Sequence, residues 1–162
     1  MADILLVEDD TNARRVMSLS LESGGYRVVD CAGVEEAEKQ LRSGAFDVVL
    51  TDLRMQRKDA GLEVVRMSGQ LQPAAKVVLI TAYASAETAV SAMKLGAFDY
   101  LTKPVSSEEL NAAVERALDV GDAAATPPSE ELPEGSLIGV SLAMQRVRER
   151  LQRACLRDFS VL

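Results

Sequence analysis

Short, almost wholly apolar runs alternate along the chain with longer segments whose apolar residues recur at helical spacing. The runs are rich in valine, leucine and isoleucine, a composition typical of strands that are covered on both faces. Such runs predict β-strands at residues 3–7, 26–30, 46–51, 76–81 and 98–102.

The segments between the runs predict helices. Between residues 13 and 21 the apolar side chains repeat at helical spacing, and the glycine pair at 24–25 ends the helix. Residues 110–118 repeat that spacing, and Ser106 with Glu109 forms a capping box at the start of this helix. Less periodic segments predict helices at 34–43, 61–71 and 84–95.

Strands that alternate with helices pair in parallel through right-handed crossovers. Five repeats of this pattern predict an α/β fold with a doubly wound, five-stranded parallel sheet. In such sheets, binding sites form beyond the carboxyl ends of the strands. The residues at those ends are therefore the first place to look for chemistry.

Ionisable and hydroxyl side chains stand at the ends of four predicted strands. The set consists of Glu8, Asp9, Asp10, Asp52, Thr81 and Lys103. Neighbouring carboxylates repel one another, and Mg²⁺ prefers oxygen ligands with room for water, so a divalent cation is the expected compensating charge. Beside a cation, Asp52 is a candidate nucleophile for phosphoryl transfer, and Lys103 and Thr81 can bind phosphoryl oxygens.

Composition narrows the classes of function. The net charge of −7 argues against attraction of the whole chain to nucleic acid or anionic lipid. Histidine is absent, which excludes Ser-His-Asp and Cys-His catalysis and imidazole zinc sites. Cys31 and Cys155 match no metal spacing and are expected to be reduced thiols. Without an apolar stretch of membrane-spanning length or an N-terminal signal, the protein is expected in the cytoplasm, with no membrane partner.

Four strings of the chain, in order, resemble a known family: "ILLVEDD", "VVLTDLRM", "VLITAYAS" and "AMKLGAFDYLTKPV". Together they resemble the CheY-like receiver domain of bacterial two-component response regulators over residues 3 to about 119. The last two strings are specifically similar to the NtrC family of sigma-54-dependent transcriptional activators. The resemblance implies strand order 2-1-3-4-5 and a phosphoacceptor signalling domain rather than an enzyme.

The resemblance also implies a metal site and a phosphoacceptor. Asp52 would accept a phosphoryl group from a sensor histidine kinase. Asp9 would bind Mg²⁺ directly, together with Asp52 itself, and Glu8 would act through the metal or its waters. The backbone carbonyl of Arg54 would complete the metal site.

A conformational switch is implied by the same resemblance. Thr81 and Lys103 would contact the phosphoryl group, and Tyr100 would reorient when Thr81 moves. The Lys103–Pro104 bond would be cis. The surface formed by the helix at 84–95, the strand at 98–102 and the following helix would then be remodelled to control dimerisation.

One loop departs from the family pattern. Receivers usually read "DLRMPGMDG" after the phosphoacceptor, whereas this chain reads "DLRMQRKDAG" from Asp52 to Gly61. Gln56 replaces a proline, and one residue is inserted before Gly61. We expect this more basic loop to alter the lifetime of the phosphoryl group.

The composition changes after about residue 119. Residues 120–136 are rich in alanine, proline, glycine and acid and are predicted to be a linker. Residues 137–162 resemble the start of the AAA+ domain of NtrC-family activators, with a helix predicted after Ser141. The chain has no G-x-x-x-x-G-K-[ST] motif and no helix-turn-helix domain, so ATP hydrolysis and contacts with sigma-54 RNA polymerase and DNA are expected only of domains missing from it.

Some residues and alternative functions have simpler explanations in the sequence. Asp10, Asp47 and Asp99 are expected to be helix caps or solvated turns rather than site residues. A constitutive receiver-like interaction module that is never phosphorylated would have the same fold, but such domains generally lack one of the site residues. A nucleotide-binding or phosphatase-like α/β enzyme ranks last, because the first strand-to-helix turn has acids where glycines are needed.

Overall fold

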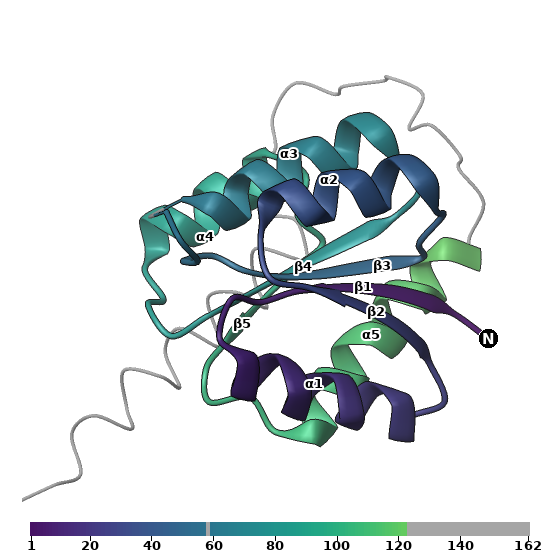
Figure 1. The fold of residues 1–162 in the computed structure, drawn as a ribbon. Helices are drawn as coiled ribbons and strands as arrows, with labels where there is room; N and C mark the ends of the chain where they lie inside the picture. Colours follow the sequence, from purple (N-terminus) through teal and green to yellow (C-terminus); the bar gives the residue numbers. More distant parts are fainter. Residues whose placement is uncertain (58, 123–162) are drawn as a thin grey trace, which may run out of the picture.

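The computed structural model describes residues 1–57 and 59–122, which form one sheet with helices on both faces (Figure 1). The ten elements alternate along the chain as strand and helix. They are β1 (Asp3–Val7), α1 (Thr11–Ser23), β2 (Arg27–Cys31), α2 (Val34–Ser43), β3 (Val48–Asp52), α3 (Ala60–Leu71), β4 (Lys76–Thr81), α4 (Ala86–Lys94), β5 (Asp99–Thr102) and α5 (Ser107–Asp122).

The five strands are all parallel and lie in the order β2-β1-β3-β4-β5. Helices α1 and α5 cover one face of the sheet, and α2, α3 and α4 cover the other (Figure 1). The predicted α/β class, the doubly wound sheet and the strand order are therefore confirmed.

The apolar strand sequences are explained by this double cover. Successive side chains of a strand point to opposite faces. Ile4, Leu6 and Leu50 pack in the cluster beneath α1 and α5, whereas Leu5 and Val49 pack in the cluster beneath α2, α3 and α4. Because helices exclude water from both faces of the sheet, the central strands must be apolar at almost every position.

Two predicted helix caps are present. The Asp10 carboxylate accepts a hydrogen bond from the Ala13 amide at 2.7 Å and caps α1. Before α5, the Ser106 hydroxyl accepts from the Glu109 amide, and the Glu109 carboxylate accepts from the Ser106 amide, both at 3.1 Å. These bonds satisfy amides that the first turn of a helix leaves without partners.

The expectation for Asp99 is wrong. Asp99 lies in β5 with 6% of its surface exposed, and its carboxylate pairs with Arg116 of α5 at 2.8 Å. The alternation of β5 turns Asp99 toward α5, where a buried carboxylate needs a cation. Asp47, in contrast, lies in an exposed bend, as expected, and accepts a hydrogen bond from the Asp3 amide.

Helix α5 continues to Asp122 and so runs past residue 119, where the composition changes. The rest of the predicted linker and the segment 137–162 lie outside the described residues. In the part of the chain that is described, no helix is both long and apolar enough to cross a membrane.

Candidate functional site

Parallel pairing brings the carboxyl ends of the strands to one edge of the sheet, and the polar residues of the sequence gather there. Asp52 is the last residue of β3 and Thr81 the last residue of β4. Glu8 and Asp9 follow β1, the neighbour of β3, and Lys103 follows β5 at the edge of the sheet.

Lys103 links two of the carboxylates. Its Nζ lies 2.6 Å from Oε2 of Glu8 and 2.7 Å from Oδ2 of Asp52. The lysine directly follows β5, so its side chain spans the end of β4 to reach the residues at the ends of β3 and β1. The peptide bond between Lys103 and Pro104 is cis, as the resemblance implied.

Burial and charge compete in this cluster. Burial raises the pKa of Glu8, which is only 1% exposed, although the contact with Lys103 opposes the shift. Burial alone would lower the pKa of Lys103, but its hydrogen bonds to Asp52 and Glu8 outweigh burial and raise it. One ammonium group therefore serves more than one carboxylate, and the cluster keeps a negative excess.

The donor set suits a hard divalent cation. Glu8, Asp9 and Asp52 each offer a carboxylate oxygen, and these atoms lie within 4.8 Å of one another. Asp9 is exposed while the other two are buried, so solvent can reach one side of the cluster. Carboxylates with water on the open side fit Mg²⁺, which keeps several of its waters.

Backbone and arginine contacts hold Glu8 in place. The Asp10 amide donates to Oε1 of Glu8 at 3.1 Å, and Nη1 of Arg14 donates to the Glu8 carbonyl at 2.7 Å. Arg14 also pairs with Asp30 at the end of β2. No motif of the sequence marks Arg14 as a site residue; its position in the first turn of α1, soon after the acidic run, is the signal that points to it.

The connection after β3 is fixed by close backbone packing. The Arg54 amide donates to Oδ1 of Asp52 at 3.2 Å, and the Gly61 amide donates to the Leu53 carbonyl at 3.0 Å. A Cβ atom on Gly61 would overlap the carbonyl oxygen of Asp52. Gln56, which replaces the usual proline, lies against Gly33 at the start of α2.

The two predicted switch residues are both buried, and Tyr100 contacts α4. Thr81 is fully buried, and its Oγ1 accepts a hydrogen bond from the Tyr83 amide at 3.1 Å. Tyr100 is 2% exposed, and its hydroxyl lies 3.2 Å from Oγ1 of Thr88 in α4. Burial raises the pKa of Tyr100.

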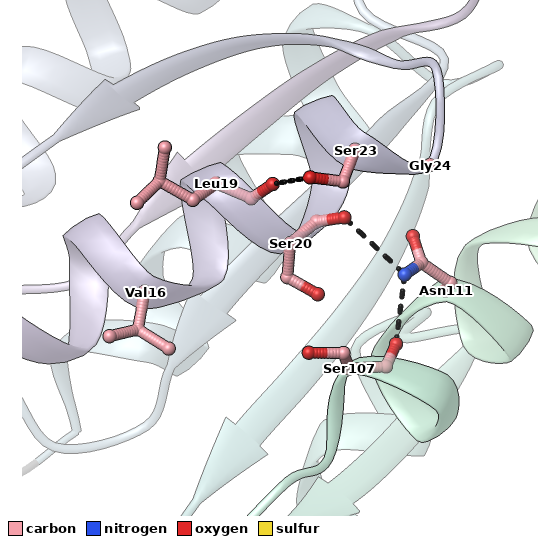
Figure 2. Close-up of a pocket in the computed structure, with 7 residues that line it drawn as sticks. All are labelled: Val16, Leu19, Ser20, Ser23, Gly24, Ser107 and Asn111. Carbon is pink, nitrogen blue, oxygen red and sulfur yellow. Dashed lines mark hydrogen bonds between the residues drawn. The ribbon is translucent and has the colours of Figure 1, made fainter.

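A separate hollow lies between α1 and α5 (Figure 2). Its lining is apolar, hydroxyl or amide in character and includes Val16, Leu19 and Asn111. The Asn111 amide nitrogen bridges the carbonyl groups of Ser20 and Ser107 across it. Because none of the lining side chains is ionisable, this hollow lacks the groups that phosphoryl chemistry needs.

Comparison with known proteins gives one consistent result. The family model described as "Response regulator receiver domain" matches residues 4–115. The transcriptional regulatory protein ZraR of Salmonella typhimurium is 35% identical over 161 residues, which cover 99% of this chain and 36% of that protein. The response regulator protein PilR of Pseudomonas aeruginosa is 35% identical over 148 residues, covering 91% of this chain and 32% of that protein.

Solved structures agree with the sequence matches. A receiver domain from Methanospirillum hungatei has a TM-score of 0.72 at 28% identity and covers 76% of this chain and 98% of that one. The beryllofluoride-activated NtrC4 receiver domain dimer has a TM-score of 0.70 at 30% identity, with 75% and 99% covered. The chain spans about a third of the length of the curated relatives that it matches.

Proposed function

This chain belongs to the response regulator receiver family, and from that premise we propose that its Asp52 accepts a phosphoryl group from a histidine kinase. The resemblance to receiver domains of NtrC-family regulators is confirmed. The observation that carries the proposal is the contact of Asp52 with the Lys103 ammonium, beside two further carboxylates at one edge of the sheet.

The proposed transfer of a phosphoryl group to Asp52 requires only a few side chains. A carboxylate oxygen of Asp52 attacks phosphorus, the bond from phosphorus to the donor breaks, and the donor keeps the electron pair. The donor is the phosphohistidine nitrogen of a kinase, or acetyl phosphate, which leaves as acetate. Lys103 and Thr81 bind phosphoryl oxygens and hold the group in line, so most of the catalysis is positioning and charge compensation.

The cation site supports this chemistry. Glu8, Asp9, Asp52 and the carbonyl of Arg54 would hold Mg²⁺, in agreement with the oxygen donor set of the cluster. When bound, Mg²⁺ supplies positive charge that offsets the carboxylates and the incoming phosphoryl group. Lys103 already bonds to Asp52, so it needs no large movement to contact a phosphoryl group there.

Phosphorylation would act as a two-state switch. The Thr81 hydroxyl would turn from the Tyr83 amide toward a phosphoryl oxygen, and Tyr100 would reorient with α4. The exposed surface of α4, β5 and α5 would change, and a second copy would bind there. The similarity to the NtrC4 receiver dimer supports this arrangement.

The wider setting follows the relatives. We place residues 1–119 in the receiver, 120–136 in a linker and 137–162 at the start of an AAA+ domain, all in the cytoplasm. Phosphorylation would control oligomerisation and, through domains outside this chain, sigma-54-dependent transcription. The relation to ZraR and PilR, which are named as regulators, supports this role.

The test is the intact mass of the protein after incubation with acetyl phosphate and Mg²⁺. We expect a single phosphate adduct that requires Mg²⁺ and is lost in Asp52→Asn. Asp47→Asn, an exposed carboxylate in a bend away from the cluster, is the matched control and should be phosphorylated like wild type. No adduct in wild type, or an adduct that persists in Asp52→Asn, would favour the constitutive interaction module instead.

A further inference from the structure

Outside the acidic cluster, one contact joins the two loops that border it. The guanidinium carbon of Arg54 lies 4.1 Å from the ring centroid of Tyr83. Arg54 stands two residues after Asp52, and Tyr83 two residues after Thr81. Tyr83 is 60% exposed, so the arginine covers an aromatic ring that would otherwise face solvent.

Arg54 and Tyr83, the two residues of this cation–π stack, each also form a backbone hydrogen bond with a side chain of the site. The backbone amide of Arg54 donates to the Asp52 carboxylate, and the backbone amide of Tyr83 donates to the Thr81 hydroxyl. Asp52 and Thr81 are therefore linked through Arg54 and Tyr83 by a chain of three contacts. A change at either site side chain reaches the stack through one hydrogen bond.

The charge of Arg54 has no carboxylate partner within 4.0 Å among the residues that the structure describes, whereas Arg57 in the same loop pairs with Glu63. A cation over an exposed aromatic ring is held weakly. Arginine binds phosphoryl oxygens more strongly, with several donors in one plane. The guanidinium is therefore held near the site by an interaction that a phosphoryl group can displace.

Phosphorylation of Asp52 would add negative charge to the site, and a further cation can offset that charge. Glu8, Asp9 and Asp52 outnumber Lys103 by two charges, which one divalent cation balances. An acyl phosphate on Asp52 carries about one more negative charge than the carboxylate it replaces. When the Thr81 hydroxyl turns to the phosphoryl group, the Tyr83 amide loses its acceptor and the stack loosens.

We propose that Arg54 is a second cationic ligand of the phosphoryl group and that Tyr83 holds it in reserve until Asp52 is phosphorylated. This inference rests on the proposed phosphorylation of Asp52. It assigns the side chain of Arg54 a role separate from the metal-binding role of its backbone carbonyl. The ring of Tyr83 and the phosphoryl group compete for the same guanidinium. Breaking the cation–π contact therefore reduces the free energy that Arg54 contributes to phosphoryl binding.

The experiment measures the affinity of the full chain for beryllofluoride, a phosphoryl mimic, in saturating Mg²⁺ by ¹⁹F NMR titration. Arg54→Gln should weaken binding about tenfold, the size expected for a charge-assisted hydrogen bond. Tyr83→Leu should tighten binding about two- to fivefold, because the competing cation–π contact is lost. Arg57→Gln removes the same charge from the same loop and should leave the affinity unchanged.

A double variant separates direct from indirect effects. In Arg54→Gln the additional Tyr83→Leu substitution should change nothing, since the ring acts only through the arginine. Binding of Mg²⁺ alone is measured in parallel. Equal losses of Mg²⁺ and beryllofluoride affinity in Arg54→Gln would place the side chain at the metal and overturn the inference.

Other outcomes are equally decisive. If wild type does not bind beryllofluoride in Mg²⁺, the proposed function itself fails. If wild type binds and Arg54→Gln binds equally well, only the role of Arg54 fails. Weaker binding in Tyr83→Leu would mean that the ring supports the site rather than competes with the phosphoryl group.

Discussion

Lys103 is the residue on which the electrostatics of the site depend. It is 23% exposed and contacts Glu8 and Asp52, whose side chains are almost fully buried. Removing one partner of a buried ion pair leaves an uncompensated charge, which costs more than the net value of the pair. A divalent cation can supply the missing charge, so lysine and metal stabilise the same carboxylates.

Lys103→Met keeps the length of the side chain and removes its charge. We expect the free energy of unfolding of the metal-free protein to fall by about 1–3 kcal/mol, below the range for fully buried pairs because solvent screens Lys103. Added Mg²⁺ should stabilise the variant more than wild type. Urea unfolding followed by circular dichroism, with and without Mg²⁺, measures both effects.

Lys39→Met, at an exposed position of α2, is the control and should behave as wild type in both conditions. Equal stabilisation of wild type and Lys103→Met by Mg²⁺ would contradict a shared role of lysine and metal.

Helix α3 shows how packing between a helix and a strand positions the site. Gly61 in its first turn contacts the backbone of Asp52, the last residue of β3, and of Leu53 after it, so the helix lies directly against the proposed phosphoacceptor. Gly69, near the end of the same helix, has open space where a Cβ would lie. Position 61 therefore has no room for a side chain, whereas position 69 of the same helix has room for one.

Gly61→Ala should lower the free energy of unfolding by about 1–3 kcal/mol, because the methyl group forces α3 away from β3. Phosphorylation by acetyl phosphate should slow as Asp52 and Arg54 shift. Gly69→Ala should instead stabilise the protein by about 0.5–1 kcal/mol through helix propensity. Urea unfolding and intact mass measure the two effects; a Gly61→Ala protein as stable as wild type would show that the connection can relax.

The edge of the sheet that carries the acidic cluster and the proposed dimer surface involve neighbouring elements, β4, α4 and β5. Thr81 ends β4, and Tyr100 in β5 contacts Thr88 in α4. The buried side chain of Tyr100 thus connects β5 to α4, and both elements belong to the proposed dimer surface. The coupling between phosphorylation and dimerisation would be short and direct.

Dimerisation induced by beryllofluoride and Mg²⁺ tests this coupling. Lys94→Glu reverses an exposed charge at the end of α4 and should weaken the dimer about tenfold, since charge complementarity governs such contacts. Lys39→Glu makes the same change on α2, away from the proposed surface, and should dimerise as wild type does. Sedimentation equilibrium measures both; equal weakening would locate the interface elsewhere.

Sequence patterns predict the elements and the polar residues that end the strands. Apolar runs and helical spacing depend on local side chains, and the acidic run, Asp52, Thr81 and Lys103 are visible in the order of residues. The boundaries differ from the prediction by only one or two residues for most elements. The caps at Asp10 and Ser106 were predicted because capping involves neighbours in the chain.

Which of these residues touch depends on the packing of the folded chain. Lys103 reaches Glu8 and Asp52 across β4, Asp99 turns to Arg116 rather than to solvent, and Arg54 stacks on Tyr83. Each contact joins residues from different elements, so it depends on strand register and on how helices pack over the sheet. Those are set by the burial of the entire core, and no local pattern of residues carries that information.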